Sequence, residues 1–243
     1  MVSTIKLGVA ALSNTRILAL AITSVLGGFL LIASASLGQD MTAPQGVGGL
    51  CGTTVTTNVK LTQDLSCAGN GLVVGANGVT IDLNGHTIAG SGPFRPFIGI
   101  AVSGWSNVTI RDGTVTMFRT GVTIVNSNHV KVKDLAAVGN GLAGSASGDG
   151  IRVLSSTDVK IKKVVVAGSG SDGIEIQGSA EVVVSHSTIR GGLAGIAFTG
   201  APSTNTKIHK NWIRDNRCGI RGPTDGIALT ENVFERNGSD FCA

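Results

Sequence analysis

Two Asp-Gly pairs carry the residues of this sequence that are best suited to chemistry. Asp149 opens the run Asp-Gly-Ile-Arg-Val and Asp172 opens the run Asp-Gly-Ile-Glu-Ile, which place Arg152 and Glu175 at the same position after each aspartate. Carboxylates held side by side raise one another's pKa, bind a hard cation such as calcium, or pair with arginine. In an enzyme these three carboxylates would orient a cation or act as acid and base, and Arg152 would polarise a substrate carboxylate.

The same four residues also have a purely structural interpretation. Asp-Gly is common at tight corners, and Arg152 with Glu175 would form a cross-strand ion pair on neighbouring strands. Structural ion pairs crowd carboxylates as active sites do, so the residue types alone favour this interpretation. Calcium has no further support in the sequence, and no cofactor is predicted.

Arginines and aromatic residues upstream of these acids suit a sugar acid. Arg95 and Arg119 are expected to project near Arg152, at a cleft over the strands that carry these residues. Phe94 and Phe97 are available to stack on sugar rings there. The planar fork of arginine binds carboxylates through two parallel hydrogen bonds. These residues predict an acidic polysaccharide as ligand. The alternative for the two phenylalanines is packing of their loop onto the fold.

A second set of cations is expected to point outward from another sheet: Arg111, Lys131, Lys133, Lys160, Lys162, Lys207 and His209. Stacked at strand spacing they would form a basic stripe, but Val183 and Ser185 interrupt it, which favours a solvated face. The four histidines show no metal-ligand spacing, and Met41 and Met117 are few for Cu(I), which needs soft ligands. No metal site is predicted.

The elements that must position these residues recur through the chain. Gly followed by alternating apolar residues appears at Gly71, Gly99, Gly121, Gly150, Gly173, Gly195 and Gly219, with steps of 28, 22, 29, 23, 22 and 24 residues. Two further apolar segments follow within most repeats, which predicts three short strands per coil and about seven stacked coils. Asn84, Asp112, Asn211 and Asn232 are expected at the corners between strands, because these residue types tolerate tight bends and αL geometry. A β-sandwich is the less favoured alternative because it has no fixed period.

Two coils are longer than the others at the corner before the Gly-Ile strand. The extra residues fall in 89–98 and 138–149. Insertions on one face of a solenoid mark its binding face. We expect these loops to wall a cleft over the first sheet.

The amino terminus predicts export. Lys6 and Arg16 precede an uncharged apolar stretch, and Ala33-Ser34-Ala35 provides a cleavage signal, so residues 1–35 are interpreted as a signal peptide and 36–50 as a linker. A retained membrane anchor is the alternative; after signal removal no membrane association is expected. Loss of two cations lowers the net charge from +4 to +2. That value argues against nucleic acid binding, and 36 glycines with 14% charged residues exclude a coiled coil.

The four cysteines lie at the two ends of the remaining domain, residues 51–243. In an exported protein an even number predicts disulfides, and the local pairs Cys51–Cys67 and Cys218–Cys242 are favoured among three possible pairings. These pairs would close loops of 16 and 24 residues.

The repeat carries a family resemblance. Gly-Ile-x-Ile, then Val-x-Ile, then x-Ile, repeated through residues 71–234, resembles the right-handed parallel β-helix repeat of pectate lyases, polygalacturonases, alginate epimerases and NosD-like periplasmic proteins. The resemblance implies an all-β, right-handed parallel β-helix in a secreted or periplasmic protein. The Asp-Asp and His-Gly motifs of polygalacturonases and the Asp-Pro-His-Glu motif of alginate epimerases are absent.

Three functions remain open at this stage. The first is binding of an acidic or cell-envelope polysaccharide in the cleft, and the second is a lyase or hydrolase acting on a uronate polymer. The third is a structural or adhesive surface protein. The oligomeric state is not predicted.

Overall fold

Short parallel strands separated by tight corners build the structure, a computed structural model that describes residues 49–141 and 148–243. The internal contacts divide the chain into Met1–Leu37 and Gly38–Ala243, and the strands belong to the second unit. The predicted signal peptide and most of the predicted linker lie outside the described residues, as does part of the second long loop. Within the described residues no helix has the length and apolarity to cross a bilayer.

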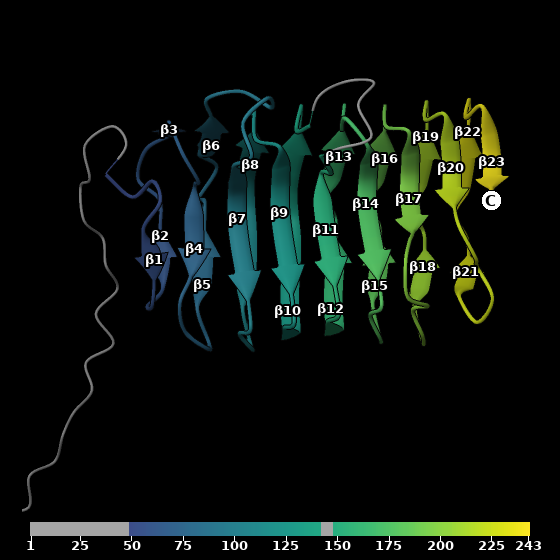
Figure 1. Ribbon diagram of the computed structural model, residues 1–243, viewed down its shortest axis with the longest axis horizontal. Coiled ribbons are helices and arrows are strands. Elements are labelled where there is room, and N and C mark those ends of the chain that lie inside the picture. The colour runs from purple at the N-terminus through teal and green to yellow at the C-terminus, as the bar shows by residue number, and fades with distance from the viewer. Residues whose placement is uncertain (1–48, 142–147) are drawn as a thin grey trace, which may run out of the picture. The chain divides into compact units, whose positions relative to one another are not determined.

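The first sheet faces the viewer in Figure 1 and has nine parallel strands. In spatial order they are β1 (Thr54–Val55), β4 (Leu72–Val74), β7 (Ile98–Ser103), β9 (Thr120–Val125), β11 (Ile151–Leu154), β14 (Asp172–Gln177), β17 (Ala194–Phe198), β20 (Cys218–Arg221) and β23 (Ser239–Cys242). Seven of them begin at or near the predicted repeat glycines.

The second sheet contains the other two strands of each coil, fourteen strands in total. The middle strands are β2 (Val59–Lys60), β5 (Thr80–Asp82), β12 (Thr157–Lys162), β15 (Val183–Ser185), β18 (Lys207–His209) and β21 (Ala228–Thr230). The third strands are β3 (Leu65–Cys67), β6 (Thr87–Gly90), β13 (Val165–Ala167), β16 (Thr188–Arg190), β19 (Trp212–Arg214) and β22 (Val233–Glu235). In two coils the middle and third strands form one continuous strand that runs through the corner between them, namely β8 (Thr109–Thr116) and β10 (Asn128–Val138).

The prediction of an all-β, right-handed parallel β-helix is confirmed, with about eight turns rather than seven. The additional strands are β1 and β23 at the two ends. Neither begins with the Gly-Ile pattern, which is why the repeat did not reveal them.

Columns of aliphatic side chains fill the space between the sheets. Ile100, Val122, Ile151, Ile174 and Ile196 are paired in register on successive strands of the first sheet, and all are fully buried. At about 4.8 Å per coil their side chains stack in van der Waals contact along the whole domain. The alternation predicted for these strands therefore holds, with the isoleucines inward and the charged residues outward.

Some predicted corner residues have a different task. Asn84 and Asp112 take positive φ as predicted, at 50° and 59°. Asn211 and Asn232 lie between strands as predicted, but without positive φ. Instead, Asn211 Oδ1 accepts the Ser187 N–H at 3.0 Å, and Asn232 Oδ1 accepts the Asn211 N–H at 3.1 Å. These side chains satisfy backbone donors that the bend would otherwise leave buried and unpaired.

Both predicted disulfides are formed. Cys51–Cys67 joins residues near the first coils, and Cys218–Cys242 joins β20 to β23 at the other end. The two disulfides therefore lie at opposite ends of the stack of coils.

We predict that replacing both Cys218 and Cys242 by alanine lowers the free energy of unfolding by about 3 kcal/mol, because the 24-residue loop no longer restricts the unfolded chain. Urea denaturation with and without reductant measures this change. Reductant should lower the free energy of unfolding of the double variant less than it lowers that of the parent. A loss below about 1 kcal/mol would contradict the assigned role of this disulfide.

Candidate functional site

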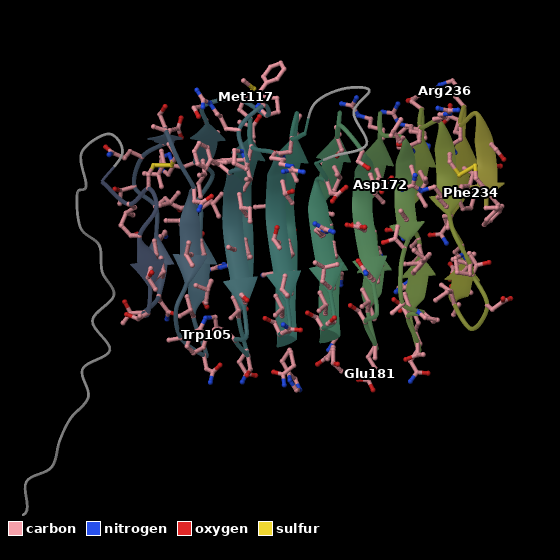
Figure 2. All side chains as sticks on the ribbon, viewed as in Figure 1. Trp105, Met117, Asp172, Glu181, Phe234 and Arg236 are labelled. Atoms are coloured by element: carbon pink, nitrogen blue, oxygen red, sulfur yellow. A yellow bond between two sulfur atoms is a disulfide. The ribbon has the colours of Figure 1, made fainter. Side chains whose placement is uncertain are left out.

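The outward face of the first sheet brings the predicted charged residues together. Thr123, Arg152 and Glu175 stand in register on β9, β11 and β14. Asp149 and Asp172 lie just before this row on adjacent coils, and the Asp172 backbone N–H donates to Asp149 Oδ1 at 3.2 Å. Both aspartates are buried, and Figure 2 shows Asp172 at the start of β14.

These residues line a groove of about 430 Å³. Pro96, Ile98 and Arg119 contribute from the upstream side, and Arg221 contributes from the downstream side. Of the predicted site residues, the groove therefore contains Asp149, Arg152, Asp172, Glu175 and Arg119. Below, "the groove" means this surface.

Three predicted ligand-binding residues do not line the groove. Phe94 is 79% exposed, and Phe97 packs against the hydrophobic core, as the packing alternative predicted for that side chain. Arg95 is exposed on the same loop, outside the groove lining. The loop therefore contributes Pro96 and Ile98 to the groove instead of its charged and aromatic residues.

Two ion pairs organise the groove. Arg152 Nε lies 2.5 Å from Glu175 Oε2 and 3.9 Å from Asp149 Oδ2. Arg221 Nη2 donates to Asp172 Oδ2 at 2.7 Å. Glu175 also accepts a hydrogen bond from the Thr199 hydroxyl at 2.7 Å. The cross-strand pair of Arg152 with Glu175 that the sequence predicted is present.

Arg221 reaches Asp172 across an intervening strand. It stands in register with Ala197 on β17, whereas its partner Asp172 is on β14. Ala194 and Ala197 are fully buried. Their small side chains leave room for the arginine to cross β17. Arg221 was not among the predicted site residues; the two alanines on the intervening strand are the sequence signal that could have indicated its reach.

The sequence profile of the family described as periplasmic copper-binding protein (NosD) matches residues 56–242. The chain belongs to the NosD family. A periplasmic family and two disulfides place this NosD-family protein outside the cytoplasm, as predicted. No curated protein matches it significantly.

Several solved structures are similar to this NosD-family protein. The mannuronan C-5 epimerase AlgE4 A-module of Azotobacter vinelandii is 13% identical, with a TM-score of 0.44 and coverage of 80% of this chain and 75% of that one. Pectate lyase Pel9A is 13% identical, with a TM-score of 0.43 and coverage of 83% and 62%. The alginate lyase of Paenibacillus sp. str. FPU-7 is 11% identical, with a TM-score of 0.41 and coverage of 75% and 91%.

Burial and crowding perturb the acids of the NosD-family groove. Burial raises the pKa of Asp149 to about 7, and the negative charges of Glu175 and Asp172 add to the effect against the opposing Asp172 N–H and Arg152. Burial also raises the pKa of Asp172, against the lowering effect of Arg221. Asp149 therefore exchanges its proton near neutral pH, where an acid–base group is most useful.

The basic stripe on the second sheet is partly neutralised by its own neighbours. Arg111 pairs with Asp82 and Asp112, and Lys160 pairs with Asp158. Such pairing is typical of a solvated face, which is the interpretation that the sequence favoured.

Proposed function

We propose that this NosD-family protein binds an acidic polysaccharide in the groove. The observation that carries the proposal is an arginine with no carboxylate partner: Arg119 lines the groove and is exposed, and no carboxylate of the described residues lies within 4.0 Å of its guanidinium. A sugar carboxylate is a matching ligand because it accepts both hydrogen bonds of the guanidinium fork.

The other groove arginines set the character of the surface. Arg152 and Arg221 are held in place by their carboxylate partners. The N–H groups that these pairs do not use are therefore held in fixed positions for a ligand. Preorganised donors lose less entropy on binding than free side chains do. The groove also runs across several coils, which suits an extended polymer better than a small molecule.

Cu(I), one form of the copper that the family description names, does not fit the soft donors that the described residues offer. Cu(I) prefers thiolate and thioether ligands. Within residues 49–141 and 148–243 all four cysteines are in disulfides and Met117 is the one methionine. In the same residues no three His, Cys, Asp or Glu side chains gather closely enough to hold a metal ion.

We predict that Arg119→Ala weakens binding of polygalacturonate or alginate by roughly 10- to 150-fold, the equivalent of about 1.5 to 3 kcal/mol for a lost charged hydrogen bond. Isothermal titration calorimetry at low salt measures the change. Binding by the parent should also weaken as salt rises, because exposed charges are screened within about 10 Å at 0.1 M.

Arg95→Ala is the matched control, since it removes an exposed arginine of the neighbouring loop that does not line the groove. It should leave the affinity nearly unchanged. Equal losses in both variants would place the ligand on the loop instead of in the groove. If neither polymer binds the parent, the structural or adhesive function takes precedence.

A second candidate function, cleavage of the bound uronate polymer by a lyase or hydrolase reaction, is favoured by Asp149. A groove carboxyl with a pKa of about 7 can give or take a proton at neutral pH. Incubation of the parent with the same polymers, followed by assays for unsaturated and reducing ends, tests this function. Products formed by the parent but not by Asp149→Asn would establish it.

A further inference from the structure

Two of the three carboxyls in the groove each have a close arginine partner, and the third does not. Arg152 contacts Glu175 closely, and Arg221 contacts Asp172. Asp149 has only a longer contact with Arg152, whose Nε lies 3.9 Å from Asp149 Oδ2. The Asp149 side chain is nevertheless buried, with 8% of its surface exposed. Because a buried carboxylate without a cation of its own is costly, Asp149 is the group on which a proton is best accommodated.

The hydrogen bonds of the cluster agree with this count. Asp149 Oδ1 accepts the Asp172 N–H, which both its neutral and its ionised form can do. Asp172 Oδ1 is buried and accepts no hydrogen bond from the described residues. Arg152 Nε is likewise buried without a hydrogen-bond partner, so the hydrogen bonds of this cluster are incomplete, and a proton on Asp149 adds a donor to it.

We propose that binding of a polyanion in the groove is coupled to uptake of one proton by Asp149, so that acid conditions favour binding and alkaline conditions favour release. This inference rests on the proposed function and names its regulation. The coupling arises because an ionised Asp149 repels the ligand's carboxylates, and because a bound anion in turn makes that ionisation less favourable.

The charges that face Asp149 determine the sign of the coupling. They come from Arg119 before β9, Arg152 on β11, Asp172 and Glu175 on β14, and Arg221 on β20. With Asp149 neutral the groove has three cations and two anions; with Asp149 ionised it has three of each. No histidine lines the groove, and uronate carboxylates stay ionised above pH 6. A change in affinity between pH 6 and 9 therefore reports the buried acids of the groove, Asp149 and Asp172, and the Asp149→Asn variant assigns it to one of them.

The test is the dissociation constant of polygalacturonate or alginate between pH 6 and 9 at constant ionic strength. For the parent we expect a nearly constant value below pH 7, followed by a loss that approaches about tenfold per pH unit, the limit for one linked proton. Asp149→Asn keeps the hydrogen-bond acceptor and removes the titration, so its affinity should stay at the parent's acid value throughout. Asp158→Asn, on the second sheet, should keep the parent's profile.

Calorimetry of the parent in two buffers with different ionisation enthalpies gives a second measurement that needs no variant. At pH 8 it should show uptake of close to one proton for each groove filled. Binding without pH dependence or proton uptake overturns this inference and leaves the proposed function intact, as does a pH profile that persists in Asp149→Asn. Absence of binding at every pH overturns both.

Discussion

Ile151→Asp is expected to leave the domain unfolded at room temperature. Ile151 is fully buried on β11, in register with Val122 on one side and Ile174 on the other. An aspartate there places an unpaired carboxyl inside a continuous apolar column, at a cost of several kcal/mol. The total stability of a domain is roughly 5 to 15 kcal/mol, so this one change removes much of it. Circular dichroism during thermal unfolding measures the result.

Val165→Asp is the control for this substitution. Val165 is an aliphatic residue on β13 with 41% of its surface exposed, so the new charge stays in water. This variant should melt within a few degrees of the parent. If Ile151→Asp melted as close to the parent as that, the inward orientation of the first sheet's isoleucines would be refuted.

Gly173→Ala should also destabilise the domain, although it adds a single methyl group. A Cβ at this position would lie 2.4 Å from Ile189 Cγ2 and 2.6 Å from the carbonyl oxygen of Gly195 on the next coil. The carbonyl belongs to the backbone of a neighbouring strand, so the clash cannot be relieved by a change of rotamer. The spacing between the coils has to increase locally. We expect the free energy of unfolding to fall by about 1 to 3 kcal/mol or more, as measured by urea denaturation.

Gly69→Ala is the matched control. A Cβ at Gly69 would meet no atom within 4 Å, and its φ lies outside the left-handed range. This variant should be as stable as the parent, or slightly more stable, because alanine restricts the unfolded chain. Equal destabilisation in both variants would mean that the glycines matter for backbone freedom and not for the close approach of coils.

The sequence was most informative where stacking decides the structure. Each repeat glycine begins a strand whose neighbours repeat the same alternation, so the register of Arg152 with Glu175 followed from the period alone. Corners were harder to predict. Lys163, His186 and Lys210 adopt positive φ at one corner of successive coils, at 54°, 54° and 56°. Their side chains have no strong preference for that geometry; the stacked strands on either side impose it.

The same distinction explains the candidate site. Asp149 and Asp172 came together because both occupy fixed positions relative to the repeat. Arg95 and Phe94 lie in an inserted loop whose path the period does not determine, and they are outside the groove. Thr199 was missed because a residue just beyond a strand gives no sign in the sequence that its hydroxyl will reach Glu175 on the preceding coil.

The reach of Arg221 alters how the stack comes apart. In a solenoid each unit ordinarily interacts with its immediate neighbours alone, so unfolding advances from an end one unit at a time. The contact of Arg221 with Asp172 joins next-nearest neighbours and encloses β17 between them, and the Cys218–Cys242 bond extends the connection to β23. We therefore expect the first-sheet strands β14, β17, β20 and β23 to open less independently of one another than strands joined by nearest-neighbour contacts alone.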